Sequence, residues 1–317
     1  MHDYTVYGGW LRSGIPIPEL RPRRMSVTTA AVDAGSAEWD FQVVTGPPPE
    51  LPSSVRTARD ELHPGVFAEL FRGPNICRLT FDDTGVFDVS DAGRRVVWYP
   101  REGCEPDVAR ADLVGRVLPL TLHDQGLTSL HGSAVVLDER AVAFLAPKNH
   151  GKSTLAMGLV ERHGARLLSD DTLIVAPDSG IARAGVPSVR LWEHTAQRFD
   201  GLRGGREVLS EKHIFEQMPP EWLAEDATPL SAIYALAPSP AGSPDAARRY
   251  ALDGPEATIA LIQYQKLGAL LAGLDAVRVF ELAATLASRV PLFRLEVARD
   301  LDRLPDVTAA IVAWHLA

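Results

Sequence analysis

The stretch Phe144-Leu145-Ala146-Pro147-Lys148-Asn149-His150-Gly151-Lys152-Ser153-Thr154 decides the fold of this chain. It begins at the end of the apolar run 141–145 and leads into a helical pattern that reaches His163, with Leu155 and Leu159 on one side. A continuous apolar run is typical of a strand buried on both faces, and the change to a helical period after a short polar loop indicates a strand, loop and helix. We therefore predict an α/β domain built around this stretch.

The loop matches the phosphate-binding pattern G-x-x-x-x-G-K-[ST] except at its first glycine, where Ala146 stands. An alanine fits there only if its φ is negative. Gly151 allows the backbone to approach phosphates, Lys152 directs a charge at the β and γ oxygens, and Ser153 offers a hydroxyl to Mg²⁺. The alternative is a capped helix with a chance Gly-Lys-Ser. The pattern predicts that a nucleoside triphosphate such as ATP is bound with Mg²⁺ by these residues: Asn149, His150, Gly151, Lys152, Ser153 and Thr154.

Two adjacent carboxylates, Asp170 and Asp171, end the next apolar run. A carboxylate at a strand end beside a phosphate loop is where a metal partner or a base for an attacking hydroxyl is expected. If both stand on a strand, they point to opposite faces, so they cannot share one task. The alternative is that they are turn or capping residues. His131, just before the run 133–137, is a further candidate, although a single histidine is more often structural.

The flanking regions suggest two domains. Residues 1–103 contain short alternating runs and a hairpin signal around Asp82-Asp83-Thr84, and we interpret them as a β-rich, antiparallel accessory domain. Residues 104–317 open with a helical run from Pro106 to about Leu122 and contain the phosphate loop. Later helices are expected at 256–265, 276–288 and 304–314, a strand at 291–297, and a loop at 237–247.

Composition limits the function classes. The chain has 317 residues, of which 46% are hydrophobic and 23% charged, which is ordinary for a globular protein. A net charge of −9 argues against nucleic acid as a partner. Neither a signal peptide nor an apolar run long enough for a membrane span is evident, so we expect a cytoplasmic protein without membrane contact. The two cysteines, Cys77 and Cys104, have no metal-binding spacing.

These motifs together resemble a known family. Leu130-His131-Gly132-Ser133, the loop 146–154 and Leu167-Leu168-Ser169-Asp170-Asp171 resemble the C-terminal kinase domain of bacterial HPr kinase/phosphorylase. The whole chain is similar to the HPr-kinase-like proteins of peptide natural-product clusters, including the tailoring kinases of lasso-peptide clusters. The flanking stretches that support this resemblance are 7–8, 15–20, 189–192, 231–236 and 291–295.

The resemblance implies a P-loop kinase domain with a mixed central sheet, preceded by a β-rich N-terminal domain. It also implies that Asp170 is the base for an acceptor hydroxyl, with His131 beside it, and that Lys152 and Mg²⁺ absorb charge on the transferred group. Asp171 and Ser153 become the metal-side pair. Arg190 and Lys212 are candidates for phosphate or acceptor contacts, with solvent-exposed surface as the alternative for each.

The chain departs from the family pattern in two places, and these departures bear on the expected donor, reaction and substrate. The loop is less glycine-rich than the family's, which leaves the phosphoryl donor open. The glutamate-bearing stretch used for phosphorolysis has no counterpart near 186–192, so we expect no reverse reaction, and HPr itself is not the expected substrate. Because the related kinases associate, a homo-oligomer is left open.

The sequence therefore predicts a Mg²⁺-dependent kinase that phosphorylates a serine-type hydroxyl on a peptide or small molecule, with a natural-product precursor peptide as one candidate. Two alternatives come from other classes. One is a nucleotide-binding regulatory or scaffold protein without catalysis. The other is an enzyme resembling phosphoenolpyruvate carboxykinase, which needs additional lysine and histidine metal ligands.

Overall fold

The computed structural model describes residues 1–23, 38–51, 53–208, 212–240, 243–273 and 275–315. The chain forms two compact units, Met1–Leu127 with Leu267–Phe280, and Thr128–Lys266 with Glu281–Ala317.

The boundary between the two units lies after Leu127 and not after residue 103, because the helical segment that follows residue 103 packs within the first unit. The Tyr7 hydroxyl donates to the Val114 carbonyl (2.9 Å), and Trp39 Nε1 donates to Thr121 Oγ1 (2.8 Å). Whether either half folds alone stays a prediction.

The first unit is built on one nine-stranded sheet with the order β3-β1-β2-β4-β9-β8-β7-β6-β5. Its strands are β1 (His2–Val6), β2 (Gly9–Ser13), β3 (Arg21–Pro22), β4 (Glu38–Val43), β5 (Val55–His63), β6 (Val66–Arg72), β7 (Ile76–Phe81), β8 (Gly85–Ser90) and β9 (Arg95–Pro100). Its helices are α1 (Pro106–Asp112), a π-helical turn (Leu113–Val117), α2 (Leu118–Asp124), α6 (Gly268–Leu271) and the first residues of α7 (Ala276–Arg289).

The sheet of the first unit is not wholly antiparallel, which corrects our expectation. β4 pairs in parallel with both neighbours, β2 and β9, while β5 to β9 form an antiparallel meander. Parallel neighbours need a long connection instead of a tight turn. The meander β5–β8 is itself the connection between β4 and β9. The predicted hairpin between β7 and β8 is confirmed.

The second unit is built on a mixed sheet in which β12, β19 and β21 are parallel. On one side β11 pairs antiparallel with both β12 and β13, and on the other side β20 pairs antiparallel with β21. The start of β19 also pairs with β15, which continues to β14 and β10. The strands are β10 (Thr128–Leu130), β11 (Gly132–Leu137), β12 (Arg140–Leu145), β13 (Arg166–Ser169), β14 (Leu173–Ala176), β15 (Ile181–Arg183), β19 (Thr228–Pro238), β20 (Ala247–Ala251) and β21 (Leu292–Val297). A small separate sheet has the order β16 (Val189–Trp192), β18 (Lys212–Phe215), β17 (Arg206–Val208).

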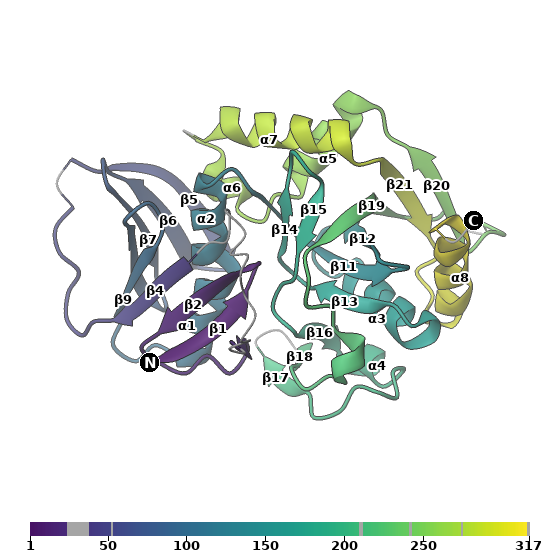
Figure 1. Ribbon diagram of the computed structural model, residues 1–317, viewed down its shortest axis with the longest axis horizontal. Helices are drawn as coiled ribbons and strands as arrows, with labels where there is room; N and C mark the ends of the chain where they lie inside the picture. The colour runs from purple at the N-terminus through teal and green to yellow at the C-terminus, as the bar shows by residue number, and fades with distance from the viewer. Residues whose placement is uncertain (24–37, 52, 209–211, 241–242, 274, 316–317) are drawn as a thin grey trace, which may run out of the picture. The chain divides into compact units, whose positions relative to one another are not determined.

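Helices cover both faces of this mixed sheet (Figure 1). One hydrophobic cluster joins the sheet to α3 (Lys152–His163) and α8 (Leu304–His315), and the other joins it to α5 (Gly254–Gln263) and the second half of α7. A short helix, α4 (Glu193–Ala196), and 3₁₀ turns at Pro220–Trp222 and Leu301–Arg303 complete the unit. The expectation of a mixed α/β fold is confirmed. The predicted loop 237–247 holds except that β19 runs on to Pro238 and β20 starts at Ala247; its residues 241–242 lie outside the described residues.

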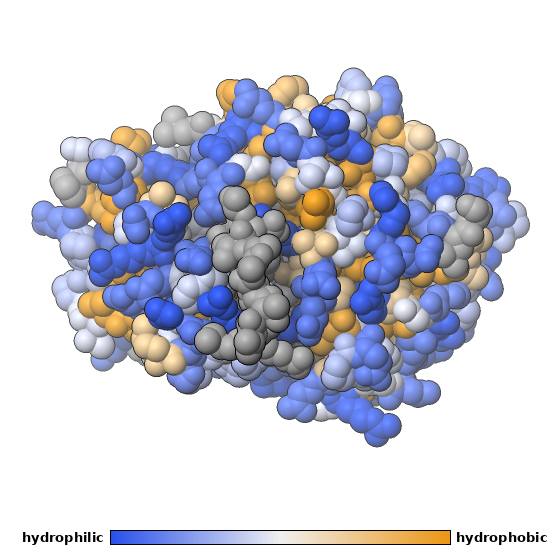
Figure 2. All heavy atoms as spheres, in the orientation of Figure 1, coloured by the Kyte–Doolittle hydropathy of each residue, from blue (hydrophilic) through white to orange (hydrophobic). Residues whose placement is uncertain are grey.

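Hydrophilic side chains predominate on the face of the molecule shown in Figure 2. Among the described residues, no helix is long and apolar enough to cross a membrane.

Candidate functional site

The loop of residues 146–151 joins β12 to α3, as the sequence predicts. Gly151 caps the helix with a φ of 85°, and an added Cβ there would meet no atom within 4 Å. The glycine is therefore required by its left-handed backbone and not by lack of space. Ala146 is fully buried and is not among the described residues with positive φ, so the condition for an alanine at this position is met. The first turn of α3 leaves backbone N–H groups free to face an anion.

The Lys152 side chain is buried against this loop, and the residue is only 6% exposed. Its Nζ donates to the carbonyls of Ala146 (2.8 Å) and Pro147 (3.0 Å), and lies 3.1 Å from His131 Nε2. These contacts use all three hydrogens of the ammonium. Burial lowers the pKa of Lys152 to about 8, although two nearby carboxylates act in the opposite direction. A bound phosphate would favour the charged form of this side chain.

Asp170 lies in a bend directly after β13, which ends at Ser169. Its Oδ1 accepts hydrogen bonds from Ser133 Oγ (2.5 Å) and Ser153 Oγ (2.8 Å), and its Oδ2 accepts from the Arg190 backbone N–H (3.1 Å). The carboxylate is thus held by β11, α3 and β16 at once. The structure pairs Ser153 with Asp170, whereas the family resemblance pairs it with Asp171.

Asp171 is not on a strand; it has a left-handed backbone with a φ of 67°. Its Oδ2 binds Lys266 Nζ (2.6 Å) and lies 3.8 Å from Arg190 Nη1, while its Oδ1 lies 3.4 Å from His131 Nδ1. Burial alone would raise the pKa of this carboxyl. The charge of Lys266, the hydrogen bond of His131 and the charge of Arg190 outweigh burial and hold its pKa well below the usual range. Asp171 is therefore an anion held between cationic and polar groups.

His131 links the two charged groups. Its Nε2 faces the Lys152 ammonium, and its Nδ1 faces both the backbone oxygen (3.2 Å) and the carboxylate of Asp171. An ammonium can only donate, so Nε2 accepts and the ring hydrogen is assigned to Nδ1, from which it is donated to Asp171. This assignment makes His131 a hydrogen-bonded bridge between Lys152 and the second carboxylate.

A short backbone ladder places Lys266 in this cluster. The His131 N–H donates to the Tyr264 carbonyl (2.7 Å), the Lys266 N–H donates to the Ser129 carbonyl (2.9 Å), and Leu130 pairs with Gln265 between them. The segment after α5 is therefore fixed to the end of β10. Sequence reasoning missed Lys266, because no motif surrounds it and 95 residues separate it from Asp171. Ser133 belongs to the motif 130–133, and the motif alone does not indicate that its hydroxyl binds Asp170.

The structure brings most of the predicted residues together. The connected cluster contains His131, Lys152, Ser153, Asp170, Asp171 and Arg190. Lys212 lies one strand further, with its Nζ 5.6 Å from the Trp192 ring centre, and Asp170 and Asp171 exert an electrostatic influence on it. His150 Nδ1 lies 2.8 Å from the Lys148 carbonyl oxygen, within its own loop. Among the described residues, the side chains of Asn149 and Thr154 make no hydrogen bond to the cluster.

Mg²⁺ fits the oxygen atoms at this site. Mg²⁺ takes one or two carboxylates and fills its remaining positions with water and substrate phosphates. The Asp170 carboxylate and the Ser153 hydroxyl, 2.8 Å apart at the start of α3, are ligands of this kind. No group of three or more His, Cys, Asp or Glu side chains suited to holding a metal by itself occurs within the described ranges.

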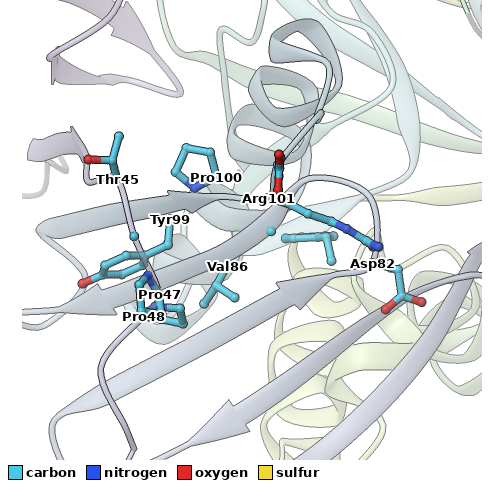
Figure 3. A pocket seen from close by; sticks show the side chains of 12 residues that line it. Thr45, Pro47, Pro48, Asp82, Val86, Tyr99, Pro100 and Arg101 are labelled. Carbon is cyan, nitrogen blue, oxygen red and sulfur yellow. The ribbon is translucent and has the colours of Figure 1, made fainter.

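A separate hollow of about 650 Å³ lies in the first unit, beside the proline-rich segment that follows β4 (Figure 3). Its lining includes Pro47, Pro48, Asp82, Tyr99 and Arg101, and none of the predicted site residues. It is therefore not part of the cluster described above.

Comparison with solved structures gives a weak structural likeness. No protein-family model matches the chain, and no curated protein matches its sequence. A solved structure of the HPr(Ser) kinase/phosphatase from Coxiella burnetii is similar at 14% identity, covering 59% of this chain and 95% of that chain, with a TM-score of 0.31. A similarity at this TM-score does not support an inference about function, and any such inference must rest on the residues of the cluster.

Proposed function

We propose that this chain is a Mg²⁺-dependent kinase that transfers the terminal phosphoryl group of ATP, or of another nucleoside triphosphate, to a serine-type hydroxyl. One observation carries the proposal: a loop lysine at a helix start and two adjacent carboxylates with different partners meet within one hydrogen-bonded cluster. Phosphoryl transfer needs such a combination of charge neutralisation at the phosphates and a positioned group for the acceptor.

The donor side is formed by the loop 146–151, Lys152, Ser153 and Asp170. The helix N–H groups and Lys152 bind the phosphates, and Ser153 with Asp170 holds Mg²⁺, which neutralises charge on the phosphate oxygens when it is bound. A γ-phosphate oxygen can replace His131 Nε2 as the third partner of the Lys152 ammonium.

The acceptor side is formed by Asp171, His131 and Lys266. Because the Ser153 bond engages Asp170 at the donor side, the geometry favours an exchange of the roles that the family resemblance implies. Asp171 becomes the carboxylate that orients the acceptor hydroxyl and takes its proton. Its low pKa makes it a weak base in the free protein, so its role depends on orientation more than on basicity. The acceptor in this proposal is a peptide or a small molecule, with a natural-product precursor peptide as the candidate that the resemblance names.

The experiment that tests this proposal measures transfer of label from γ-labelled ATP, with Mg²⁺, to a serine-containing peptide library and to cell lysate. Lys152→Ala should reduce transfer by about a hundredfold or more, since it removes a charge directed at the transferred group. Full activity in Lys152→Ala would show that the site is wrongly assigned. Tight nucleotide binding by the wild type without transfer to any acceptor would favour the regulatory alternative.

One observation favours a second candidate. An enzyme resembling phosphoenolpyruvate carboxykinase needs a lysine and a histidine as additional metal ligands, and Lys266 and His131, which both contact Asp171, are the candidates for these ligands. Oxaloacetate-dependent consumption of ATP or GTP in the presence of Mn²⁺, lost in Lys266→Met, would support this candidate. Absence of that reaction from a protein that phosphorylates peptides would exclude it.

A further inference from the structure

Lysine is rare in this chain and occurs only around the candidate site. Of 32 lysine and arginine residues, only four are lysines. These four are Lys148, Lys152, Lys212 and Lys266, and all belong to the second unit. Everywhere else the chain uses arginine for positive charge. Lysine differs from arginine in carrying a compact point charge that hydrates strongly and responds to its surroundings.

The four lysines share one electrostatic environment. Lys152 connects through His131 to Asp171, whose other oxygen binds Lys266 at 2.6 Å. Lys212 pairs across strands with Trp192, two residues after Arg190, whose backbone N–H binds Asp170. Repulsion from Lys212 and Lys266 helps burial to lower the pKa of Lys152, and repulsion from Lys148 does the same for Lys212.

The cluster has more positive charge than its carboxylates neutralise. The four lysines and Arg190 face two carboxylates, Asp170 and Asp171, which leaves an excess of three positive charges in a protein with a net charge of −9. A nucleoside triphosphate with its Mg²⁺ carries about two negative charges and compensates only part of this excess. The donor therefore leaves positive charge on the acceptor side.

We propose that the acceptor is itself an oxyanion, with a carboxylate or phosphate group near its hydroxyl, and that Lys212 and Lys266 bind this group while Lys148 and Lys152 bind the phosphates of the donor. This inference rests on the proposed function, since it assigns a substrate class to the same site. The four lysines form two pairs by position. Lys148 lies in the phosphate loop and Lys152 directly after it, whereas Lys212 lies on β18 and Lys266 lies after α5.

The scarcity of lysine supplies a direct test by amine labelling. The intact protein is treated briefly with acetic anhydride, and acetylation of each lysine and of the N-terminal amine, as internal reference, is measured by mass spectrometry. Mg²⁺ with AMP-PNP, a non-hydrolysable donor, should reduce labelling of the exposed Lys148 about fivefold or more relative to the reference, whereas the buried Lys152 should be labelled little in either state.

The acceptor arm adds one of three probes to the AMP-PNP complex: N-acetylserine, its uncharged amide, or inorganic phosphate. N-acetylserine or phosphate should protect Lys212 and Lys266, and the amide should not, because it has the same hydroxyl without the charge. Protection by N-acetylserine alone identifies a carboxylate as the anion, and protection by phosphate alone identifies a phosphate.

Three results would overturn the inference and leave the proposed function standing. In the first, AMP-PNP protects Lys148, but no anion changes the labelling of Lys212 or Lys266; the proposed function then stands without the anionic acceptor. In the second, the amide protects as well as the acid. If AMP-PNP protects no lysine at all, the proposed function fails as well, which distinguishes the two failures.

A matched pair of variants provides the third result. Lys212→Gln should weaken binding of the protecting anion to the AMP-PNP complex about tenfold, the effect of losing one charge-assisted hydrogen bond. Arg206→Gln removes the same charge from β17, the neighbouring strand in the same small sheet, and should leave the affinity unchanged. An equal loss in both variants would show non-specific attraction and overturn the inference.

Discussion

The hydroxyl of Ser153 donates a 2.8 Å hydrogen bond to Asp170 and not to Asp171, the residue that follows Asp170 in the chain. The bond is possible because Asp170 lies in a bend after β13 and Asp171 has a left-handed backbone, so the two carboxylates have separate partners. This arrangement places one carboxylate against the start of α3 and the other against His131 and Lys266.

Asparagine substitutions should separate the two carboxylates. Asp170→Asn should weaken Mg²⁺-dependent binding of AMP-PNP by about tenfold or more, because it removes a charged metal ligand. Asp171→Asn should leave that binding within about threefold of the wild type and reduce phosphoryl transfer by roughly 10² or more, the usual effect of losing a positioned base. Calorimetry and a transfer assay measure the two effects.

Asp178→Asn, in the exposed turn between β14 and β15, is the control and should change neither quantity. If Asp171→Asn weakened Mg²⁺-dependent binding and Asp170→Asn did not, the roles implied by the family resemblance would be correct and the exchange proposed above would be wrong.

Nucleotide affinity should decrease at alkaline pH because of Lys152. Its pKa is about 8, so the ammonium is lost as the pH rises through 8. The affinity for Mg²⁺ and AMP-PNP should be nearly constant up to pH 7.5 and fall by about tenfold or more by pH 9.5. Lys152→Arg keeps its charge throughout this range, so its affinity, although lower, should not change with pH. A flat profile in the wild type would mean that Lys152 stays charged.

The same pKa shift affects the stability of the free protein in the opposite direction. The ordinary pKa of Lys152 is 10.5, so between about pH 8 and 10.5 the unfolded chain binds more protons than the folded one. The contribution of Lys152 to stability is therefore full above 10.5 and is lost as the pH falls through 8. Lys152→Met should accordingly not lower the melting temperature at pH 7, even though it abolishes transfer.

His123, in the first unit, should limit stability in acid. The residue is 1% exposed, and neither ring nitrogen has a hydrogen-bond partner among the residues that the structure describes. Burial lowers its pKa from the ordinary 6.5. The stability that depends on the neutral ring is therefore complete above pH 6.5 and is lost as the pH falls through the lowered value.

His123→Leu, of similar size and without polar atoms, should raise the free energy of unfolding by roughly 1–3 kcal/mol, and by more at pH 5.5 than at pH 8. His63→Leu, an exposed position in the same unit, should change it by about 0.5 kcal/mol or less at both pH values. Destabilisation by His123→Leu at both pH values would contradict the prediction and indicate a partner for the ring.

Gly132 should be essential for the position of its neighbours His131 and Ser133. A Cβ at Gly132 would lie 2.6 Å from Leu145 Cδ2 and 2.8 Å from the Phe144 carbonyl oxygen on the adjacent strand β12. Gly132→Ala should therefore lower the free energy of unfolding by roughly 1–3 kcal/mol, as overpacking does, and should also reduce phosphoryl transfer. Gly115→Ala, in the π-helical turn with nothing within 4 Å of the new Cβ, is the control and should be neutral or stabilising.

The sequence by itself determined the local elements and the candidate loop. The apolar run 141–145 forms a strand, and the loop and the helix to His163 follow it as predicted, because a strand buried on both faces and an amphipathic helix have patterns that depend only on nearby residues. Gly151, Lys152 and Ser153 were found for the same reason. Their spacing is local, and local spacing is fixed by the covalent chain.

Only the tertiary structure decided which of these residues contact each other. Ser153 contacts Asp170 and not Asp171, because a bend and a left-handed backbone after β13 set the side-chain directions, and the sequence pattern of a strand does not encode them. Lys266 reaches Asp171 across 95 residues because a backbone ladder fixes the segment after α5 to β10. Contacts of this kind depend on how distant segments pair, and pairing is decided by the packing of the whole unit rather than by any local period.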